Sequence, residues 1–282
     1  MVPSDIRETI AHRILTPTGG FLEGFTHTLQ PYAGCPFACF YCYVRRLPIG
    51  LLGRAPWGTW LDVKLNAPAL LRRELHVLHD AGKPVRVFLS SATDPYNGWE
   101  PRYQITRRCL EVFRELPPQL LIVQTRSPLV RRDYEILRTI PAAWLSMTIE
   151  TNDEGVRKQL TPLCPSIRMR AEAVRQAKAA GIRVQIAVSP LLPCDEERFA
   201  MLLCELDPDF VIVDTLSLGD GAQGKRSEAL GCDEVLRQHG YHAWTRPDCY
   251  RRLLTLLRQC FPAQRVGLSK EGFNTWARVV GA

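Results

Sequence analysis

Short apolar runs rich in β-branched residues alternate along the chain with longer stretches in which apolar positions recur every three or four residues. The short runs predict β-strands, and the longer stretches predict amphipathic helices. The predicted strands are residues 26–31, 85–90, 120–125, 143–149, 183–188 and 210–216. The apolar helix faces include Leu71, Leu75 and Leu78; Cys109, Val112 and Phe113; Met169, Ala173 and Ala177; and Leu253, Leu257 and Cys260.

Strands that alternate with helices in this way predict parallel βαβ units with right-handed crossovers. The six predicted strands fill the chain, so we expect an α/β fold, a partial (β/α)6 TIM-like barrel of parallel strands. In such barrels the functional residues gather at the C-terminal ends of the strands. We expect a lead-in at residues 1–25 and the barrel domain at residues 26–282, with a functional loop at 34–43, a candidate lid at 44–66 and a glycine-rich loop at 217–232.

The composition of the 282-residue chain is that of a globular protein, with 46% hydrophobic and 23% charged residues. No apolar run approaches the roughly 20 residues of a spanning helix. The first nine residues carry three charged side chains and no apolar core of a secretory signal, so we expect a cytoplasmic protein without a membrane segment. The net charge of +7 permits nucleic acid or another anionic substrate as a partner.

Three of the ten cysteines, Cys35, Cys39 and Cys42, lie within eight residues of one another. We expect the other seven to be small buried side chains rather than a disulfide framework. Three thiolates without a fourth can hold an iron–sulfur cluster that keeps one iron open. A zinc site would need a fourth ligand, which the pairs His76/His79 or His239/His242 could in principle supply.

The CxxxCxxC spacing, with an aromatic residue before its last cysteine, resembles the hallmark of the radical S-adenosylmethionine (SAM) superfamily. The string from His27 to Cys35 and the sequence Tyr-Cys-Tyr at 41–43 are similar to the spore photoproduct lyase-like branch. The resemblance continues at Thr93-Asp94-Pro95-Tyr96 with Glu100, and at residues 124–127 and 146–151. It implies a 4Fe-4S cluster on the three cysteines and a bound SAM that is reductively cleaved to a 5′-deoxyadenosyl radical.

The same resemblance implies roles for further residues. Tyr41 would contact the adenine region of SAM, and Thr93 with Asp94 would face its methionine or ribose. Arg126 would touch SAM, Thr148 or Glu150 would bind the ribose hydroxyls, and the guanidinium of Arg170 suits the SAM carboxylate. Tyr41 and Tyr43 are the candidate catalytic residues, Tyr43 as a radical relay or, equally, as a packing residue.

Two departures from the lyase-like pattern point to a different, unidentified substrate. Ser91 stands where those lyases carry a cysteine hydrogen donor, and a serine O–H bond is too strong to give up its hydrogen readily to a carbon radical. Asn97-Gly98-Trp99 replaces the Gln-Pro that follows the Thr-Asp-Pro-Tyr string in the family.

The 34 residues before Cys35 are expected to leave no room for a sizeable N-terminal domain. The resemblance also implies a low-potential electron donor of the flavodoxin or ferredoxin type.

Two other functions remain open at this point. The basic residue pairs and the cysteines would also suit a metal-containing nucleic-acid-binding module without radical chemistry. The glycine-rich sequence from Gly219 to Lys225 satisfies GxGxxG and nearly satisfies the Walker pattern, which would suit an NTP-dependent enzyme. Arg226 occupies the position of the Walker Ser or Thr, so a flexible loop near the barrel mouth is the favoured interpretation there.

Overall fold

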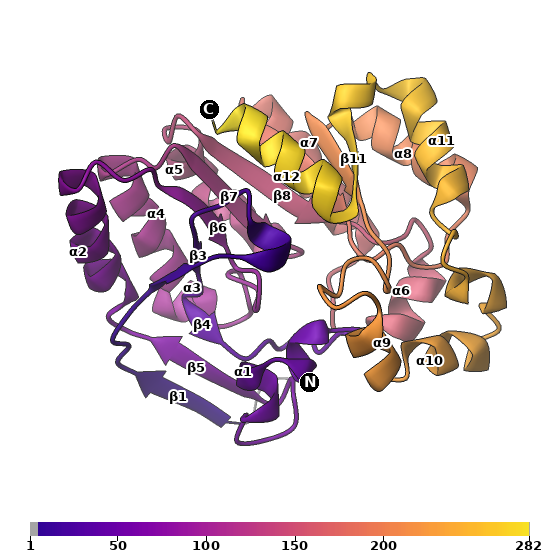
Figure 1. Ribbon diagram of the computed structural model, residues 1–282, viewed down its shortest axis with the longest axis horizontal. Helices are drawn as coiled ribbons and strands as arrows, with labels where there is room; N and C mark the ends of the chain where they lie inside the picture. The colour runs from indigo at the N-terminus through magenta and orange to yellow at the C-terminus, as the bar shows by residue number, and fades with distance from the viewer. Residues whose placement is uncertain (1–4, 282) are drawn as a thin grey trace.

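An eight-stranded sheet runs through the described part of the chain, residues 5–281 of a computed structural model (Figure 1). Every neighbouring pair is parallel except β2 with β3, so the fold is α/β and the sheet forms a partial barrel. Residues 1–4 of the expected lead-in and residue 282 lie outside the described residues. The strand order is β11 (Val266–Leu268), β10 (Phe210–Val213), β9 (Arg183–Val188), β8 (Ala143–Thr148), β7 (Leu120–Thr125), β6 (Arg86–Leu89), β3 (His27–Leu29) and β2 (Leu15–Pro17).

Helices connect the parallel strands in the order that the sequence pattern predicts. The connecting helices are α2 (Ala67–Asp80) before β6, α3 (Glu100–Tyr103) and α4 (Ile105–Glu115) before β7, α5 (Tyr134–Leu137) before β8, α6 (Glu154–Leu160) and α7 (Ile167–Ala179) before β9, α8 (Glu196–Leu206) before β10, and α9 (Lys225–Ala229), α10 (Cys232–Gln238) and α11 (Arg251–Cys260) before β11. The last helix is α12 (Ser269–Val280), and 3-10 turns lie at Gly20–Leu22, Tyr43–Arg46, Pro128–Asp133, His242–Thr245 and Ala263–Arg265.

The two faces of the sheet are covered by different elements. Leu121 and Val123 of β7 belong to a large core with the connecting helices, whereas Leu120 and Ile122 point to the inner face. The inner face is covered by α12, whose Phe273 and Trp276 pack against aromatic side chains of the strands (Figure 1). Since both faces are buried, the strands are almost continuously hydrophobic, which explains why the sequence predicted them.

All six predicted strands are confirmed, but β11 was not predicted. It has only three residues, and its pairing with β10 comes from a segment more than 50 positions away. The predicted helix faces are confirmed at most positions. Met169 is an exception, because its side chain is 48% exposed at the start of α7.

The expectation that Cys204 and Cys260 are isolated buried side chains is wrong, because the two residues form a disulfide. Helices α8 and α11 pack side by side and bring the two Cα atoms to 6.2 Å. Their separation of 56 positions in the sequence gave no sign of this pairing.

A second, three-stranded sheet lies beside the barrel and joins segments that were expected as a lead-in and a lid. Its order is β1 (Asp5–Thr9), β5 (Trp60–Lys64) and β4 (Tyr32–Ala33). Arg54 pairs with Asp5 and, at 2.6 Å, with Asp62 across this sheet. The short helix α1 (Pro48–Leu51) also lies in the expected lid segment. Much of residues 44–66 is therefore regular structure, and Arg54 stabilises the three-stranded sheet.

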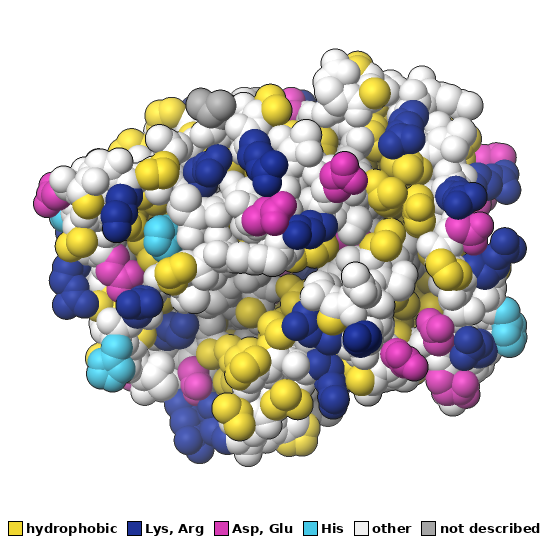
Figure 2. All heavy atoms as spheres, viewed as in Figure 1, with side chains coloured by type: hydrophobic (Ala, Val, Ile, Leu, Met, Phe, Trp, Pro, Cys, Tyr) yellow, Lys and Arg dark blue, Asp and Glu magenta, His cyan; other side chains and the backbone are white. Residues whose placement is uncertain are grey.

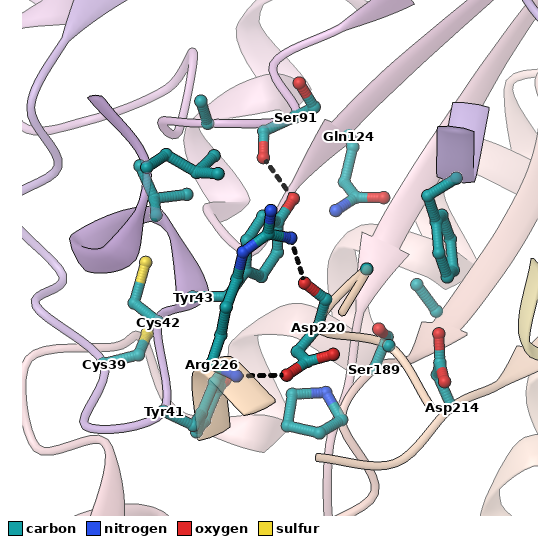
Figure 3. Close-up of a pocket in the computed structure, with 18 of the residues that line it drawn as sticks. Cys39, Tyr41, Cys42, Tyr43, Ser91, Gln124, Ser189, Asp214, Asp220 and Arg226 are labelled. Atoms are coloured by element: carbon teal, nitrogen blue, oxygen red, sulfur yellow. Dashed lines mark hydrogen bonds between the residues drawn. The ribbon is translucent and has the colours of Figure 1, made fainter. Parts of the chain in front are cut away.

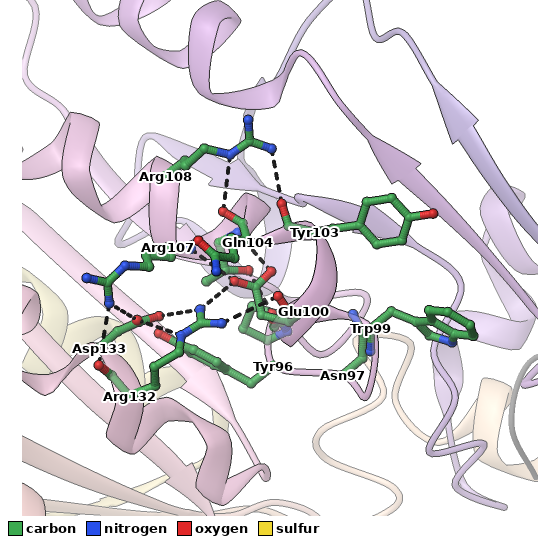
Figure 4. Close-up of polar contacts among 12 residues, drawn as sticks. Tyr96, Asn97, Trp99, Glu100, Tyr103, Gln104, Arg107, Arg108, Arg132 and Asp133 are labelled. Atoms are coloured by element: carbon green, nitrogen blue, oxygen red, sulfur yellow. Dashed lines mark hydrogen bonds and ion pairs between the residues drawn. The ribbon is translucent and has the colours of Figure 1, made fainter.

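A buried polar network fixes the segment that follows β6 (Figure 4). The Glu100 carboxylate is fully buried and accepts hydrogen bonds from the Thr106 and Arg107 backbone amides, at 3.0 and 3.1 Å, and from Tyr32. Arg132 donates to Glu100 at 2.7 Å. Glu100, which the family resemblance singled out, is thus a structural residue that anchors the loop carrying Thr93 and Asp94.

No helix among residues 5–281 is long and apolar enough to cross a membrane.

Candidate functional site

A cavity of about 410 Å³ opens at the C-terminal ends of the parallel strands. Figure 2 shows a recess at the centre of this face, with hydrophobic side chains gathered below it. The walls come from the cysteine loop, the segments after β6, β7, β9 and β10, and the residues around Gly20 and Phe273. The cavity therefore lies at the end of the strands where functional residues are expected in such barrels.

Cys35, Cys39 and Cys42 all line this cavity and are free thiols. Backbone hydrogen bonds from Ala38 N to Cys35 O, at 3.2 Å, and from Cys42 N to Cys39 O, at 3.1 Å, fold the loop into consecutive turns. The Thr93 hydroxyl donates to Gly34 O and ties the loop to the segment after β6. The local turns thus present three thiols from eight residues to one cavity; Figure 3 shows two of them, Cys39 and Cys42.

A fourth cysteine lies against this loop, which the sequence spacing did not show. The Cys164 sulfur is 3.7 Å from the Cys39 sulfur, and both side chains are buried. The hydrogen bond with Cys164 lowers the pKa of the Cys39 thiol to about 6, against the effect of burial and with the support of the Arg126 charge. Burial raises the pKa of the Cys42 thiol to about 11 and also raises the pKa of Cys35.

A second group of buried side chains centres on Glu150, at the C-terminal end of β8. Its carboxylate accepts from the Tyr41 hydroxyl at 2.7 Å and from Arg126 Nε at 3.1 Å. Arg170 donates to the other carboxylate oxygen and, at 2.9 Å, to Thr148 O. Burial alone would raise the pKa of Glu150, but the charges of Arg170 and Arg126 hold it at about 2. Glu150 is therefore ionised and positions both Tyr41 and Arg126.

The residues predicted to be catalytic or to bind a cofactor fall into two layers. Tyr41, Tyr43, Ser91, Thr93 and Arg126 line the cavity together with the three cysteines.

Asp94, Thr148, Glu150 and Arg170 are buried and do not line the cavity. Asp94 accepts hydrogen bonds from the Thr125 hydroxyl at 2.7 Å and from the Arg126 amide at 2.9 Å, so it joins the loops after β6 and β7. Arg170 is completely buried and faces Glu150, so the carboxylate that it binds belongs to the protein. These side chains form the support of the cavity wall.

Tyr43 and Ser91 lie together on another part of the wall (Figure 3). The Tyr43 hydroxyl donates to Ser91 O at 3.1 Å, and Gln30 donates to the Ser91 hydroxyl at 2.9 Å. Burial raises the pKa of Tyr43 to about 12, so its hydroxyl is protonated at neutral pH.

The glycine-rich loop lines the cavity, but its backbone amides already have an acceptor. The Asp220 carboxylate accepts from the amides of Ala222, Gly224, Arg226 and Ser227, at 2.7 to 3.2 Å. A phosphate-binding loop aims such amides at its ligand. Here an internal carboxylate occupies their place, so the interpretation of this sequence as a phosphate cradle is not supported by the geometry.

Several cavity residues were missed by the sequence reasoning. Gly19, Gly20, Phe21 and Leu22 come from the expected lead-in, and Gln124, Ser189, Asp214 and Phe273 come from strand ends and from α12. The polar residues among them directly follow the apolar runs of the predicted strands, and this position in the sequence could have marked them as cavity residues. The lead-in residues carry no comparable pattern, because their position depends on packing against α12.

Known proteins resemble this chain in sequence. The family model described as the Radical SAM superfamily matches residues 29–202. An uncharacterized protein of Methanocaldococcus jannaschii is 28% identical over 183 residues, which are 65% of this chain and 66% of that protein. An uncharacterized protein of Acidianus two-tailed virus is 29% identical over 174 residues, 58% of this chain and 56% of that protein. The chain thus spans between about half and two thirds of the length of such curated relatives.

Solved structures share the fold. Spore photoproduct lyase complexed with dinucleoside spore photoproduct superposes with a TM-score of 0.67 at 14% identity, over 95% of this chain and 82% of that chain. Streptococcus suis SuiB bound to precursor peptide SuiA gives a TM-score of 0.50 at 16% identity, over 75% of this chain and 46% of that chain. At these identities the likeness concerns the fold alone.

The donor set fits an iron–sulfur cluster. Free cysteine thiols are the ligands that such clusters require, and here three of them face a cavity large enough to receive a small molecule beside them. No group of three His, Cys, Asp or Glu side chains in the described residues is arranged around a single metal ion.

Proposed function

Because this chain belongs to the radical SAM superfamily, we propose that Cys35, Cys39 and Cys42 hold a 4Fe-4S cluster and that the enzyme reductively cleaves SAM there. The observation that carries the proposal is the exposure of the three free thiols to one cavity at the C-terminal ends of the strands. When bound, the cluster and SAM supply the electron transfer and the radical. The chain supplies binding, orientation and exclusion of water.

The residues around the cysteine loop have distinct tasks in this proposal. Arg126 places a positive charge next to Cys39, which favours the thiolate that iron binds. Glu150 and Arg170 hold Arg126 and Tyr41 in place from behind the wall. Tyr41, Thr93 and Arg126 offer polar groups to SAM at the cavity surface. Tyr43 and Ser91 lie where they can meet the substrate, Tyr43 as a protonated phenol.

The proposal also includes a class of substrate to test and an electron donor. The fold likeness to a lyase solved with a dinucleoside photoproduct makes nucleosides and nucleic acid the first substrates to test. Ser91 argues for a reaction other than that of the lyase, because it offers no weak S–H bond to a carbon radical. A low-potential protein such as a flavodoxin or ferredoxin would reduce the cluster.

Anaerobic reconstitution tests the proposal. We expect about four irons per chain and formation of 5′-deoxyadenosine from SAM with dithionite. The triple variant Cys35→Ala, Cys39→Ala, Cys42→Ala should lose both, and the matched variant Cys194→Ala, which changes a free cysteine outside the loop, should retain both.

Iron and 5′-deoxyadenosine retained by the triple variant would refute the proposal. Stoichiometric zinc without 5′-deoxyadenosine in the wild type would instead support the metal-containing nucleic-acid-binding module.

A further inference from the structure

Four strands that carry inner-core side chains are followed by polar residues at the cavity, near their C-terminal ends. Phe88, Ile122, Ala187 and Ile212 belong to the inner core. Polar residues stand two positions further along the chain, within the last residues of β7 or directly after the ends of β6, β9 and β10. These are Ser90, Gln124, Ser189 and Asp214, and all four line the cavity.

These four side chains differ from the Glu150 group in being largely without protein partners. The Ser90 hydroxyl is buried and makes no hydrogen bond, and Ser90 adopts a φ of 74° that non-glycine residues rarely use. Among the hydrogen bonds of residues 5–281, none involves the side chain of Gln124 or Ser189. Unpaired polar groups that are fixed at a cavity wall are available to a ligand.

Asp214 is the one carboxylic acid in this set. Its side chain is 2% exposed, and one carboxylate oxygen accepts from the adjacent Thr215 amide at 2.9 Å. No Lys, Arg or His of the described residues forms an ion pair with it. A buried carboxylate without a cation is costly unless a donor reaches it.

The backbone of the glycine-rich loop approaches this carboxylate closely at Gly219. A Cβ atom added at Gly219 would lie 2.7 Å from the Asp214 carboxyl group, so any side chain there would press on it. Phe88 and Phe273 supply apolar walls to the same cavity. The surroundings of Asp214 thus combine one acceptor, nearby amide and hydroxyl groups, and aromatic surface.

We propose that this end of the cavity is a substrate subsite in which Asp214 accepts hydrogen bonds from an amine, amidine or amide nitrogen of the substrate. The subsite rests on the proposed function, since it presumes that the substrate enters this cavity. The apolar body of the substrate lies against Phe88 and Phe273, and Gln124 with Ser189 binds its remaining polar edge. An anionic group is repelled from this end.

The positively charged side chains of the cavity lie toward the cysteine loop. Arg126 stands next to Cys39, and Figure 3 shows Arg226 between the labelled cysteines and Asp214. Anionic parts of a bound molecule are accordingly directed to the arginines, and the nitrogen donor is directed to Asp214. The net charge alone permits any anionic substrate. The cavity favours an anionic substrate that also carries a nitrogen donor.

The test compares two probes of equal shape and opposite charge, benzamidine and benzoate. Binding is measured by ligand-observed NMR titration of the full chain, reconstituted with iron and sulfide and saturated with SAM in the absence of reductant. We expect benzamidine to bind at least about ten times more tightly than benzoate. Asp214→Asn should reduce this preference to less than about twofold, and the exposed control Asp80→Asn should leave it unchanged.

A second variant, Gly219→Ala, keeps the test informative if Asp214→Asn folds poorly. Its added methyl group crowds the carboxylate and should weaken benzamidine binding about tenfold while leaving Asp214 in place. Equal binding of the two probes by the wild type, or a preference that survives both variants, would overturn the subsite.

Iron content is measured on the same samples, and 5′-deoxyadenosine is measured after dithionite is added to a portion of each. The exposed control Asp80→Asn should retain both. Loss of these two signals in the wild type with an intact probe preference would refute the proposed function alone.

Discussion

Glu150 shows how a single residue can organise a site that it does not line. It receives Tyr41 and Arg126 on one oxygen and Arg170 on the other; the contacts with Tyr41 and Arg170 are buried, and the contact with Arg126 is partly buried. Arg170 keeps two buried nitrogens, Nε and Nη2, without a partner, so its position depends on Glu150 and on Thr148 O. Loss of the Glu150 charge would therefore leave two guanidinium groups uncompensated.

We expect Glu150→Gln to lower the free energy of unfolding by about 3–5 kcal/mol at pH 7, because it leaves buried charges unpaired. The pKa of Glu150 is about 2 in the folded chain against 4.5 for the free side chain. The stabilisation is therefore complete above pH 4.5 and is lost as the pH falls toward 2. Urea titrations at pH 7 and pH 3 should show a smaller difference at pH 3.

Glu135→Gln is the matched control, because Glu135 forms an ion pair with Arg107 but is 52% exposed. Its urea midpoint should stay close to that of the wild type. A loss for Glu150→Gln that is the same at both pH values would contradict the assignment of an ionised, charge-paired Glu150.

Asp214 gives the opposite dependence on pH. Burial raises the pKa of its carboxyl group from 3.8 to about 7, so ionisation costs stability. The cost is absent below pH 3.8, grows between pH 3.8 and 7 and is constant above pH 7. Without ligand, Asp214→Asn should therefore raise the free energy of unfolding at pH 8 by up to about 1.4 kcal/mol for each pKa unit between the two states, and the urea midpoint should rise with it. Equal midpoints of variant and wild type at pH 8 would argue against an unpaired carboxylate.

Among the elements, the glycine-rich loop and its short helix α9 depend on one internal acceptor. Asp220 accepts from the amides of loop residues 222 and 224 and from those of residues 226 and 227, which a helix start leaves without partners. An isolated helix of five residues has little stability of its own. The loop is therefore ordered by the Asp220 carboxylate.

We expect Asp220→Ala to increase amide hydrogen exchange at residues 222–227 about tenfold or more, because each buried donor without an acceptor costs about 1–3 kcal/mol. Hydrogen–deuterium exchange followed by mass spectrometry would measure this change. Asp233→Ala, at the exposed first turn of α10, should leave the exchange of residues 222–227 unchanged. Unaltered protection in Asp220→Ala would show that another contact orders the loop.

At the scale of the whole molecule, α12 completes the barrel interior. Trp276 stacks on Phe210 with ring centroids 4.8 Å apart and meets Trp144 edge-on at 4.9 Å. Asn274 accepts from Gly24 N at 2.7 Å and donates to Phe21 O at 2.9 Å. The segment near the N-terminus is thus fixed to the last helix, and both line or support the cavity.

Trp276→Ala should lower the free energy of unfolding by about 3–5 kcal/mol, because it leaves a large cavity between the sheet and α12. Chemical denaturation would measure the loss. Val279→Ala is the control, since Val279 is 72% exposed on the same helix and its loss should be much smaller. Similar losses for both variants would contradict the role of α12 as the inner cover.

The sequence was informative where one local pattern determines the structure. The buried runs predicted the six main strands, and the cysteine loop with Tyr41 and Arg126 was recognisable from its spacing and motifs. It was less informative where distant segments meet, as in the pairing of β1 with β5, the approach of Cys164 to Cys39 and the disulfide of α8 with α11. Asp214 was missed because a single polar residue after a strand has many uses, and only the structure shows that its buried carboxylate has no ion-pair partner among the described residues.

The cover of the inner face by α12 has a consequence for biosynthesis. The ribosome completes the cysteine loop more than 200 residues before Trp276 leaves the exit tunnel. Until then α12 does not cover Phe88, Trp144 and Phe210, and the nascent sheet exposes an aromatic surface that chaperones bind well. We therefore expect iron to be delivered to a stably closed pocket only after α12 has been translated.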